Sequence, residues 1–171
     1  MTESFGQQLD LLARRLFPFA LAVLLVILSV VPVPIPGYAL VAPAFSLMAV
    51  YYWAIHGPDL MPPVAVFVIG LLQDILTGAP TGVSAFVLLL VYAAMRNQRR
   101  PFLGKPFLVM WFGFTVVAPA ATLVEWLTAS AAVGKLIPAH TTVVALLLTL
   151  AFYPWVTWLF AAGQRAFLRQ R

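Results

Sequence analysis

The sequence predicts an all-α integral membrane protein, on the evidence of its composition, its long apolar runs and the placement of its basic residues. Of its 171 residues, 63% are hydrophobic and only 9% are charged, which leaves too little polar surface to cover a soluble globule. A hydrocarbon core ~30 Å thick needs about 20 apolar residues for each crossing helix. The apolar runs allow six crossings within a single transmembrane domain over residues 1–171.

Prolines, glycines and charged residues separate the apolar runs and so mark where each crossing ends. The six transmembrane helices are expected at about 17–31, 38–55, 60–77, 81–95, 106–128 and 140–162. The fourth, with ~15 residues, is short for a crossing, so we expect thinned lipid or neighbouring helices around it. Proline and glycine in the segment 32–37 predict an extended connection between the first two helices.

A short helix is predicted ahead of the first crossing, in residues 1–16, with Ser4 as its candidate N-cap. Its apolar residues recur at helical spacing on one face: Phe5, Leu9, Leu12, Ala13 and Leu16. An amphipathic segment of this kind lies in the membrane interface. It serves either as an anchor or as a docking helix for a cytoplasmic partner.

The second crossing contains a proline and a cluster of aromatic residues. Pro43 is expected to kink it, because proline removes a hydrogen bond from the helix interior. Tyr51, Tyr52 and Trp53 follow at its end, and aromatic residues are enriched at the level of the lipid headgroups. We therefore expect these three side chains at the membrane surface.

The basic residues lie almost entirely on one side of this arrangement. Nine of the ten Lys and Arg residues belong to the N-terminus, the C-terminus or the loop after the fourth crossing, and they are Arg14, Arg15, Arg165, Arg169, Arg171, Arg96, Arg99, Arg100 and Lys105. The tenth, Lys135, falls between the last two crossings. Because cytoplasmic loops carry the excess of Lys and Arg, both termini are predicted to be cytoplasmic. The net charge of +5 then needs no nucleic acid partner.

A carboxylate, Asp74, lies inside the apolar third crossing. It lies 14 residues from the start of that helix, or ~21 Å at 1.5 Å per residue, so it belongs to the outer leaflet. A charged residue in mid-membrane costs roughly 2.5–3.5 kcal/mol on insertion scales. Either Asp74 accepts hydrogen bonds from backbone amides of the following turn, near Thr81 to Val83, or it lines an outward pocket or contacts a partner.

Glu125, near the outer end of the fifth crossing, has the same two interpretations. Lys135 is its candidate partner, because it follows in the next outer loop. Asp74, Glu125 and Lys135 together form the candidate polar site of the outer leaflet. Nothing in the sequence shows that the two acids meet.

The sequence contains none of the residue patterns that catalysis or cofactor binding would need. It has no cysteine, which excludes a disulfide, a thiolate nucleophile and a cysteine-ligated metal. It also has no nucleophile elbow, no H-E-x-x-H and no nucleotide-binding glycine pattern. We expect no enzyme activity, no metal and no cofactor.

The central segment VFVIGLLQDILTGAPTGVSAFVLLLVY carries a recognisable pattern of small residues around one acid. The pattern consists of Gly70, Asp74, Gly78, Pro80 and Gly82. It resembles the rod shape-determining protein MreD family, as do the basic loop RNQRR and the Tyr-Pro pair at Tyr153. One departure is Ser84, where the family more often has a histidine or another larger residue.

The resemblance implies a multi-pass protein of the bacterial inner membrane that has no catalytic activity. It would be a scaffold or regulator of cell-elongation peptidoglycan synthesis and hence of cell shape. MreC is the expected direct partner, and MreB, RodA and a class B penicillin-binding transpeptidase belong to the larger assembly.

The same resemblance suggests a second function through the fold. The family is suspected to be similar in fold to the substrate-binding subunits of energy-coupling-factor vitamin transporters. The alternative function is therefore that of a substrate-binding subunit for a small molecule, oriented by Asp74 and Glu125 from the outer side.

Overall fold

The computed structural model describes residues 5–30 and 42–168, with side chains described for 16–30 and 42–165. These parts of the chain form six α-helices and one 3-10 turn and contain no strand, which confirms the all-α prediction. The elements are α1 (Phe5–Val30), α2 (Phe45–His56), α3 (Pro63–Thr77), α4 (Val83–Asn97), η2 (Arg100–Phe102), α5 (Phe107–Val133) and α6 (Ala139–Leu168).

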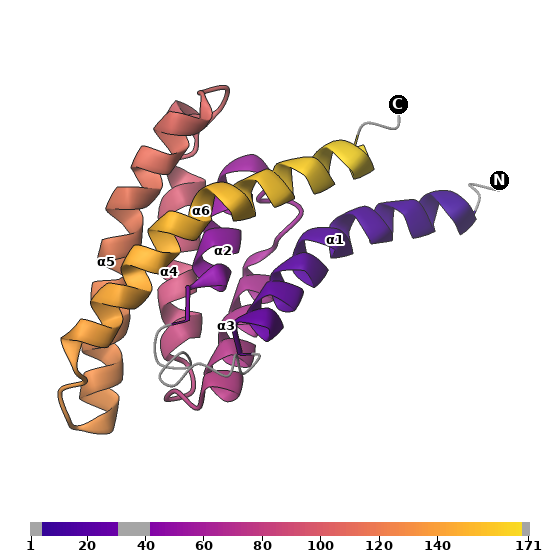
Figure 1. Ribbon diagram of the computed structural model, residues 1–171. Coiled ribbons are helices and arrows are strands. Elements are labelled where there is room, and N and C mark those ends of the chain that lie inside the picture. The colour runs from indigo at the N-terminus through magenta and orange to yellow at the C-terminus, as the bar shows by residue number, and fades with distance from the viewer. Residues whose placement is uncertain (1–4, 31–41, 169–171) are drawn as a thin grey trace.

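The short helix α2 lies at the centre of the bundle (Figure 1). Every residue from Ser46 to Ile55 is buried, and the helix packs against α1, α3, α4 and α6. A helix that is apolar on all sides has no polar face to turn to water, and here neighbouring helices cover it. The other helices are therefore arranged around α2.

The predicted second crossing differs from the helix that forms. Pro43 does not kink a helix, because α2 begins only at Phe45, and residues 38–41 lie outside the described part. The amide of Ala44, which precedes the helix, donates to Thr149 Oγ1 of α6 at 3.0 Å. A side chain from another helix thus stabilises the start of α2.

The aromatic residues of α2 are buried in the core, whereas exposure at the surface of the bundle was expected for them. Tyr51, Tyr52 and Trp53 are each at most 2% exposed. The Tyr51 ring lies 5.1 Å from that of Phe114 on α5 and 6.0 Å from that of Tyr153 on α6. These contacts join the central helix to the last two helices, which bury large aromatic area here.

The first helix also differs from its prediction. A separate interfacial helix over 1–16 and a crossing over 17–31 were expected, but α1 is one helix of 26 residues with Pro18 inside it. A proline removes one hydrogen bond and strains one turn, and the good helix formers on both sides continue the helix across it. The candidate N-cap Ser4 and the connection 32–37 lie outside the described residues.

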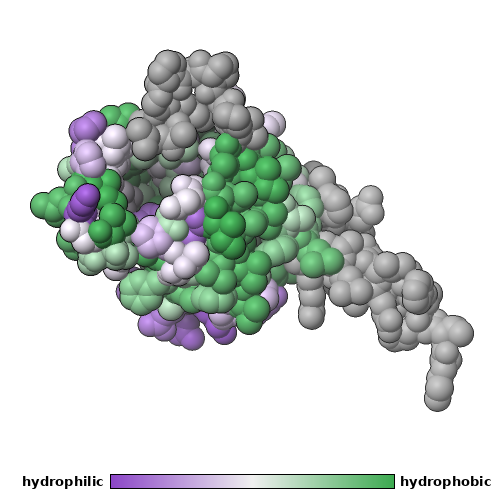
Figure 2. Space-filling model, turned by 90° about the horizontal axis from the view of Figure 1, so that it is seen from below, coloured by the Kyte–Doolittle hydropathy of each residue, from purple (hydrophilic) through white to green (hydrophobic). Residues whose placement is uncertain are grey.

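Two described helices, α5 and α6, are long and apolar enough to cross a membrane. The apolar helices Leu16–Val30, Pro63–Thr77 and Val83–Asn97 are shorter. Large apolar side chains are nevertheless exposed on the outside of the bundle, and Figure 2 shows hydrophobic residues beside hydrophilic groups on the face seen from below. An apolar surface of this extent fits lipid as its surroundings. The count of six crossings remains a prediction.

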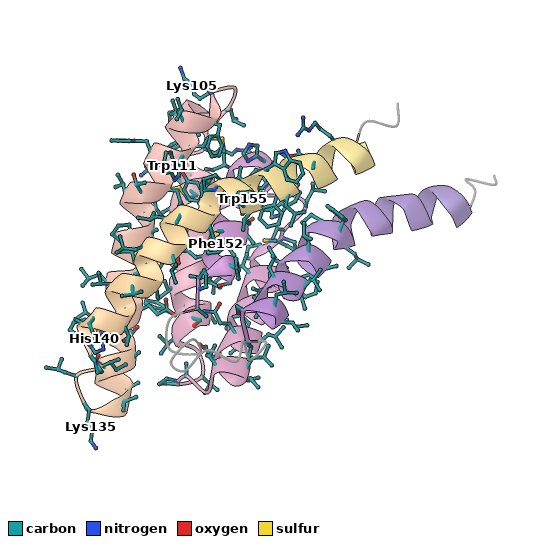
Figure 3. All side chains as sticks on the ribbon, viewed as in Figure 1. Lys105, Trp111, Lys135, His140, Phe152 and Trp155 are labelled. Carbon is teal, nitrogen blue, oxygen red and sulfur yellow. The ribbon has the colours of Figure 1, made fainter. Side chains whose placement is uncertain are left out.

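The charged loops lie at opposite ends of the bundle. The loop that contains Lys105 lies at the same end as the start of α1 and the end of α6, and Lys135 lies at the other end (Figures 1 and 3). The turn between α3 and α4 is at the Lys135 end. This arrangement positions the candidate site described next.

Candidate functional site at the α3–α4 turn

The turn between α3 and α4 forms because two glycines adopt backbone angles that other residues rarely reach. Gly78 ends α3 with φ of 68°, and Gly82 precedes α4 with φ of 99°. The amides of Gly78 and Ala79 both donate to the backbone carbonyl of Asp74. This is a helix C-terminus closed by a left-handed glycine, and it brings the chain back beside α3.

The Asp74 carboxylate holds the start of α4. Its Oδ2 accepts from the Gly82 amide at 2.7 Å, and its Oδ1 accepts from the Ser84 amide at 3.1 Å. Gly82 has no side chain to cap α4, so an acid from the preceding helix satisfies two of the amides that a helix start leaves unpaired. The carboxylate is completely buried.

The electrostatics of this arrangement explain how an acid is tolerated in an apolar region. Asp74 lies near the C-terminus of its own helix, where the partial charge is negative and disfavours it. The N-terminus of α4 supplies the opposite partial charge and donates two hydrogen bonds directly to the carboxylate. The amides of the predicted turn therefore compensate Asp74, with Ser84 lying one residue beyond the expected range.

Ser84 brings the second acid into the same network. Its hydroxyl donates to Glu125 Oε1 on α5 at 3.2 Å, while its backbone amide donates to Asp74. A chain of hydrogen bonds thus runs from α3 through α4 to α5. Sequence reasoning did not find this contact, because Ser84 and Glu125 are 41 residues apart and neither belongs to a motif that pairs them.

Lys135 does not join this site. It lies in the turn between α5 and α6, is exposed, and points away from the bundle (Figure 3). No hydrogen bond connects it to Glu125 among the described residues, where Glu125 has Ser84 as its side-chain partner instead. The turn around Lys135 is held by Trp126 Nε1 donating to the Ile137 carbonyl at 2.9 Å.

Close packing of α3 on α4 depends on Gly70. A Cβ at this position would lie 2.3 Å from the Cα of Ala85 and 2.6 Å from its backbone nitrogen, distances at which the two helices would have to move apart. The absence of a side chain lets the helices approach and keeps the Asp74 carboxylate within reach of the α4 amides. Four pattern residues, Gly70, Asp74, Gly78 and Gly82, therefore share one local task, while Pro80 lies within the turn that they form.

A further polar contact fixes α3 against the core. Gln73, the residue before Asp74, accepts a hydrogen bond at Oε1 from the hydroxyl of Ser46 on α2. Sequence reasoning passed over both residues. The signal was present, because a glutamine beside an acid in an apolar helix also needs a partner.

The remaining predicted residues lie elsewhere. Arg96 lies in the last turn of α4, Arg99 precedes η2, Arg100 begins it, and Lys105 precedes α5. All four lie at the end of the bundle opposite to the α3–α4 turn. Among the described residues, no group of three or more His, Cys, Asp or Glu side chains is placed to hold a metal ion.

Comparisons with known proteins give a family and nothing more specific. No curated protein matches the chain, and no solved structure matches it, so the suspected likeness to vitamin-transporter subunits remains a prediction. The family described as rod shape-determining protein MreD matches residues 11–162, which include the whole α3–α4 site. The chain therefore belongs to the rod shape-determining protein MreD family.

Proposed function

We propose that this protein is a non-catalytic membrane scaffold that regulates peptidoglycan synthesis during cell elongation by binding MreC. MreB, RodA and a class B penicillin-binding transpeptidase belong to the larger assembly in this proposal. The membership of residues 11–162 in the MreD family carries it, because the family is described by its role in determining rod shape.

The protein acts in the bacterial inner membrane with six crossings and both termini in the cytoplasm. The opposite placement of Lys105 and Lys135 supports this topology, because basic loops stay on the cytoplasmic side. The α3–α4 turn then faces outward.

The hydrogen bonds from the Gly82 and Ser84 amides to Asp74 support a structural role for this residue. It keeps the outer ends of α3 and α4 in one fixed geometry, which a partner recognises. The Glu125 carboxylate has one described hydrogen-bond partner, the Ser84 hydroxyl, and the residue is partly accessible. It remains able to accept a donor from the membrane or outer segment of MreC.

A pulldown of the tagged protein from its native membrane tests this function. Wild type is compared with Asp74→Asn, Glu125→Gln and a control, Asp59→Asn, which changes an exposed acid in the loop before α3. Mass spectrometry identifies the proteins that are recovered with each. We expect MreC, RodA and the transpeptidase with wild type and the control, and less MreC with Glu125→Gln.

The same experiment separates the scaffold from a transporter subunit. A substrate-binding subunit of an energy-coupling-factor transporter would bring down ATPases and no wall-synthesis proteins. Recovery of such ATPases with the wild-type protein overturns the scaffold proposal. The two outer acids would then be tested for a small-molecule ligand.

A further inference from the structure

The end of the bundle opposite to the α3–α4 turn contains a concavity lined by arginines. Arg96, Asn97, Arg99 and Arg100 line it, and its volume is about 400 Å³. This size falls in the range of ~300–1,000 Å³ that is usual for small-ligand sites. Three arginines from five consecutive positions thus line one space.

The charges of this concavity are not balanced by its own lining. No carboxylate lines it, and among the described residues neither Arg99 nor Arg100 has an acidic partner. Arg96 lies beside the Tyr92 hydroxyl, and the carboxylate of Asp59 is also near that hydroxyl. Like charges held close together repel one another unless an anion lies between them. The cytoplasmic topology explains why the loop is basic, but it does not require the three arginines to converge.

The neighbouring surface indicates where the anion comes from. Leu103, Phe107 and Leu108, which follow the concavity in the chain, are 51%, 40% and 66% exposed. Leu103 directly follows η2, and Phe107 and Leu108 begin α5, at the boundary between the charged loop and the apolar helices. A group held by the arginines at this level would have acyl chains beside these side chains. An anionic lipid supplies both the negative group between the arginines and the acyl chains beside the apolar side chains. A free anion supplies only the negative group.

We propose that Arg96, Arg99 and Arg100 form a binding site for the phosphate of an anionic phospholipid in the cytoplasmic leaflet. Arginine presents a fork of donors that matches phosphate oxygens in a bidentate manner. The carbonyl groups at the C-terminus of α4 disfavour an anion, so the side chains supply the attraction. Asn97 donates a further hydrogen bond from its amide. This site rests on the proposed cytoplasmic position of the loop but does not need the scaffold function.

Lipid binding to the purified full-length protein tests the site. Native mass spectrometry or a fluorescent-lipid titration in detergent measures the affinity for phosphatidylglycerol and for phosphatidylcholine. We expect the wild type to bind phosphatidylglycerol more tightly. Arg99→Gln/Arg100→Gln should weaken this binding by about tenfold for each guanidinium–phosphate pair that it removes. Arg99→Lys/Arg100→Lys keeps the charge and the topology but not the fork, so we expect an intermediate affinity.

A second double variant provides the matched control. Lys105→Gln/Arg165→Gln removes two positive charges from the same end of the protein, outside the concavity. It is expected to keep the preference for phosphatidylglycerol. Equal weakening in both double variants, or equal affinity of the wild type for both lipids, overturns the proposal, because the attraction would then be diffuse or absent.

Competition with inorganic phosphate distinguishes a site for a lipid phosphate group from a site for free phosphate. Phosphate is titrated as a competitor at constant ionic strength. Failure of millimolar phosphate to displace the lipid supports a lipid site that needs the acyl chains as well. Displacement by phosphate, together with the absence of phosphate binding in Arg99→Gln/Arg100→Gln, assigns the site to a free anion and overturns the lipid proposal.

Discussion

The Asp74 carboxylate on α3 accepts a hydrogen bond from the backbone amide of Ser84, the second residue of α4, at 3.1 Å. One residue therefore caps a helix that it does not belong to. Because the other carboxylate oxygen accepts from the Gly82 amide, two hydrogen bonds hold the start of α4 against the end of α3. The consequence is that a change at Asp74 acts on the whole of this end of the helix pair.

Replacing Asp74 is expected to destabilise the protein in a graded way. Asp74→Ala leaves the half-buried Gly82 amide and the buried Ser84 amide without acceptors, at a cost of up to about 1–3 kcal/mol for each. Asp74→Asn keeps one acceptor oxygen and removes the charge, so its cost is smaller. The thermal unfolding midpoint in detergent is expected to fall in the order wild type, Asn, Ala.

The matched control for this series is Asp59→Ala. Asp59 is exposed, and its replacement is expected to leave the unfolding midpoint within about 1 °C of wild type, since exposed substitutions change stability by under ~0.5 kcal/mol. Equal midpoints for Asp74→Ala and the control would show that the carboxylate does not hold the turn.

Adding a methyl group at Gly70 is expected to separate α3 from α4. The new Cβ in Gly70→Ala would lie 2.3 Å from the Cα of Ala85, and overpacking of this kind costs typically ~1–3 kcal/mol. Gly57→Ala is the control, because its Cβ would meet side chains and no backbone atom: the end of Leu60 at 3.1 Å and the Trp53 ring at 3.5 Å. We expect a lower unfolding midpoint for Gly70→Ala than for Gly57→Ala.

A second substitution tests the cause. Ala85→Gly in the Gly70→Ala background removes the Ala85 methyl group but not its Cα or nitrogen, the closest atoms. We therefore expect no recovery of stability. Full recovery would mean that only the two side chains collide and that the backbones are not in close contact.

Much of the α3–α4 site was predictable because its signals are local. Gly78, Pro80 and Gly82 are residues that turns require, and an acid in an apolar helix needs a nearby partner. The turn amides are the nearest donors to Asp74 in the chain. The partner of Glu125 was mispredicted for the opposite reason, since proximity in sequence favoured Lys135, whereas helix packing places Ser84 there.

The helix boundaries and the burial of α2 were less predictable. Composition does not distinguish an apolar helix that faces lipid from one that faces other helices, because both need apolar side chains. Tyr51, Tyr52 and Trp53 therefore resemble headgroup residues although they are buried in the core. Pro43 was predicted inside a helix, although α2 begins after it. The hydrogen bond from the Ala44 amide to Thr149 that precedes the helix joins distant parts of the chain, so no local sequence pattern indicates it.

The hydrogen bond between Ser84 and Glu125 is expected to couple α4 to α5 energetically. Ser84→Ala removes the hydroxyl but leaves the backbone amide that donates to Asp74. A double-mutant cycle with Ser84→Ala and Glu125→Ala should give a coupling energy of about 1.5–3 kcal/mol if Glu125 is ionised and about 0.5–1.5 kcal/mol if it is neutral. The coupling energy is measured by unfolding in denaturant. Ser84→Thr keeps a hydroxyl group and should retain most of the free energy of unfolding. Additive effects of the two substitutions would contradict the contact.

The absence of cysteine from the sequence allows a direct test of the proposed topology. Single variants Lys105→Cys and Lys135→Cys place a thiol at an exposed position at each end of the bundle. A maleimide reagent that does not cross the inner membrane is added to cells with a permeable outer membrane. We expect labelling of Lys135→Cys in intact cells and of Lys105→Cys only after the inner membrane is opened. The wild-type protein, which has no cysteine, measures background labelling. Labelling of both variants from the outside, or of Lys105→Cys alone, would contradict cytoplasmic termini, because α5 would then not cross in the proposed direction.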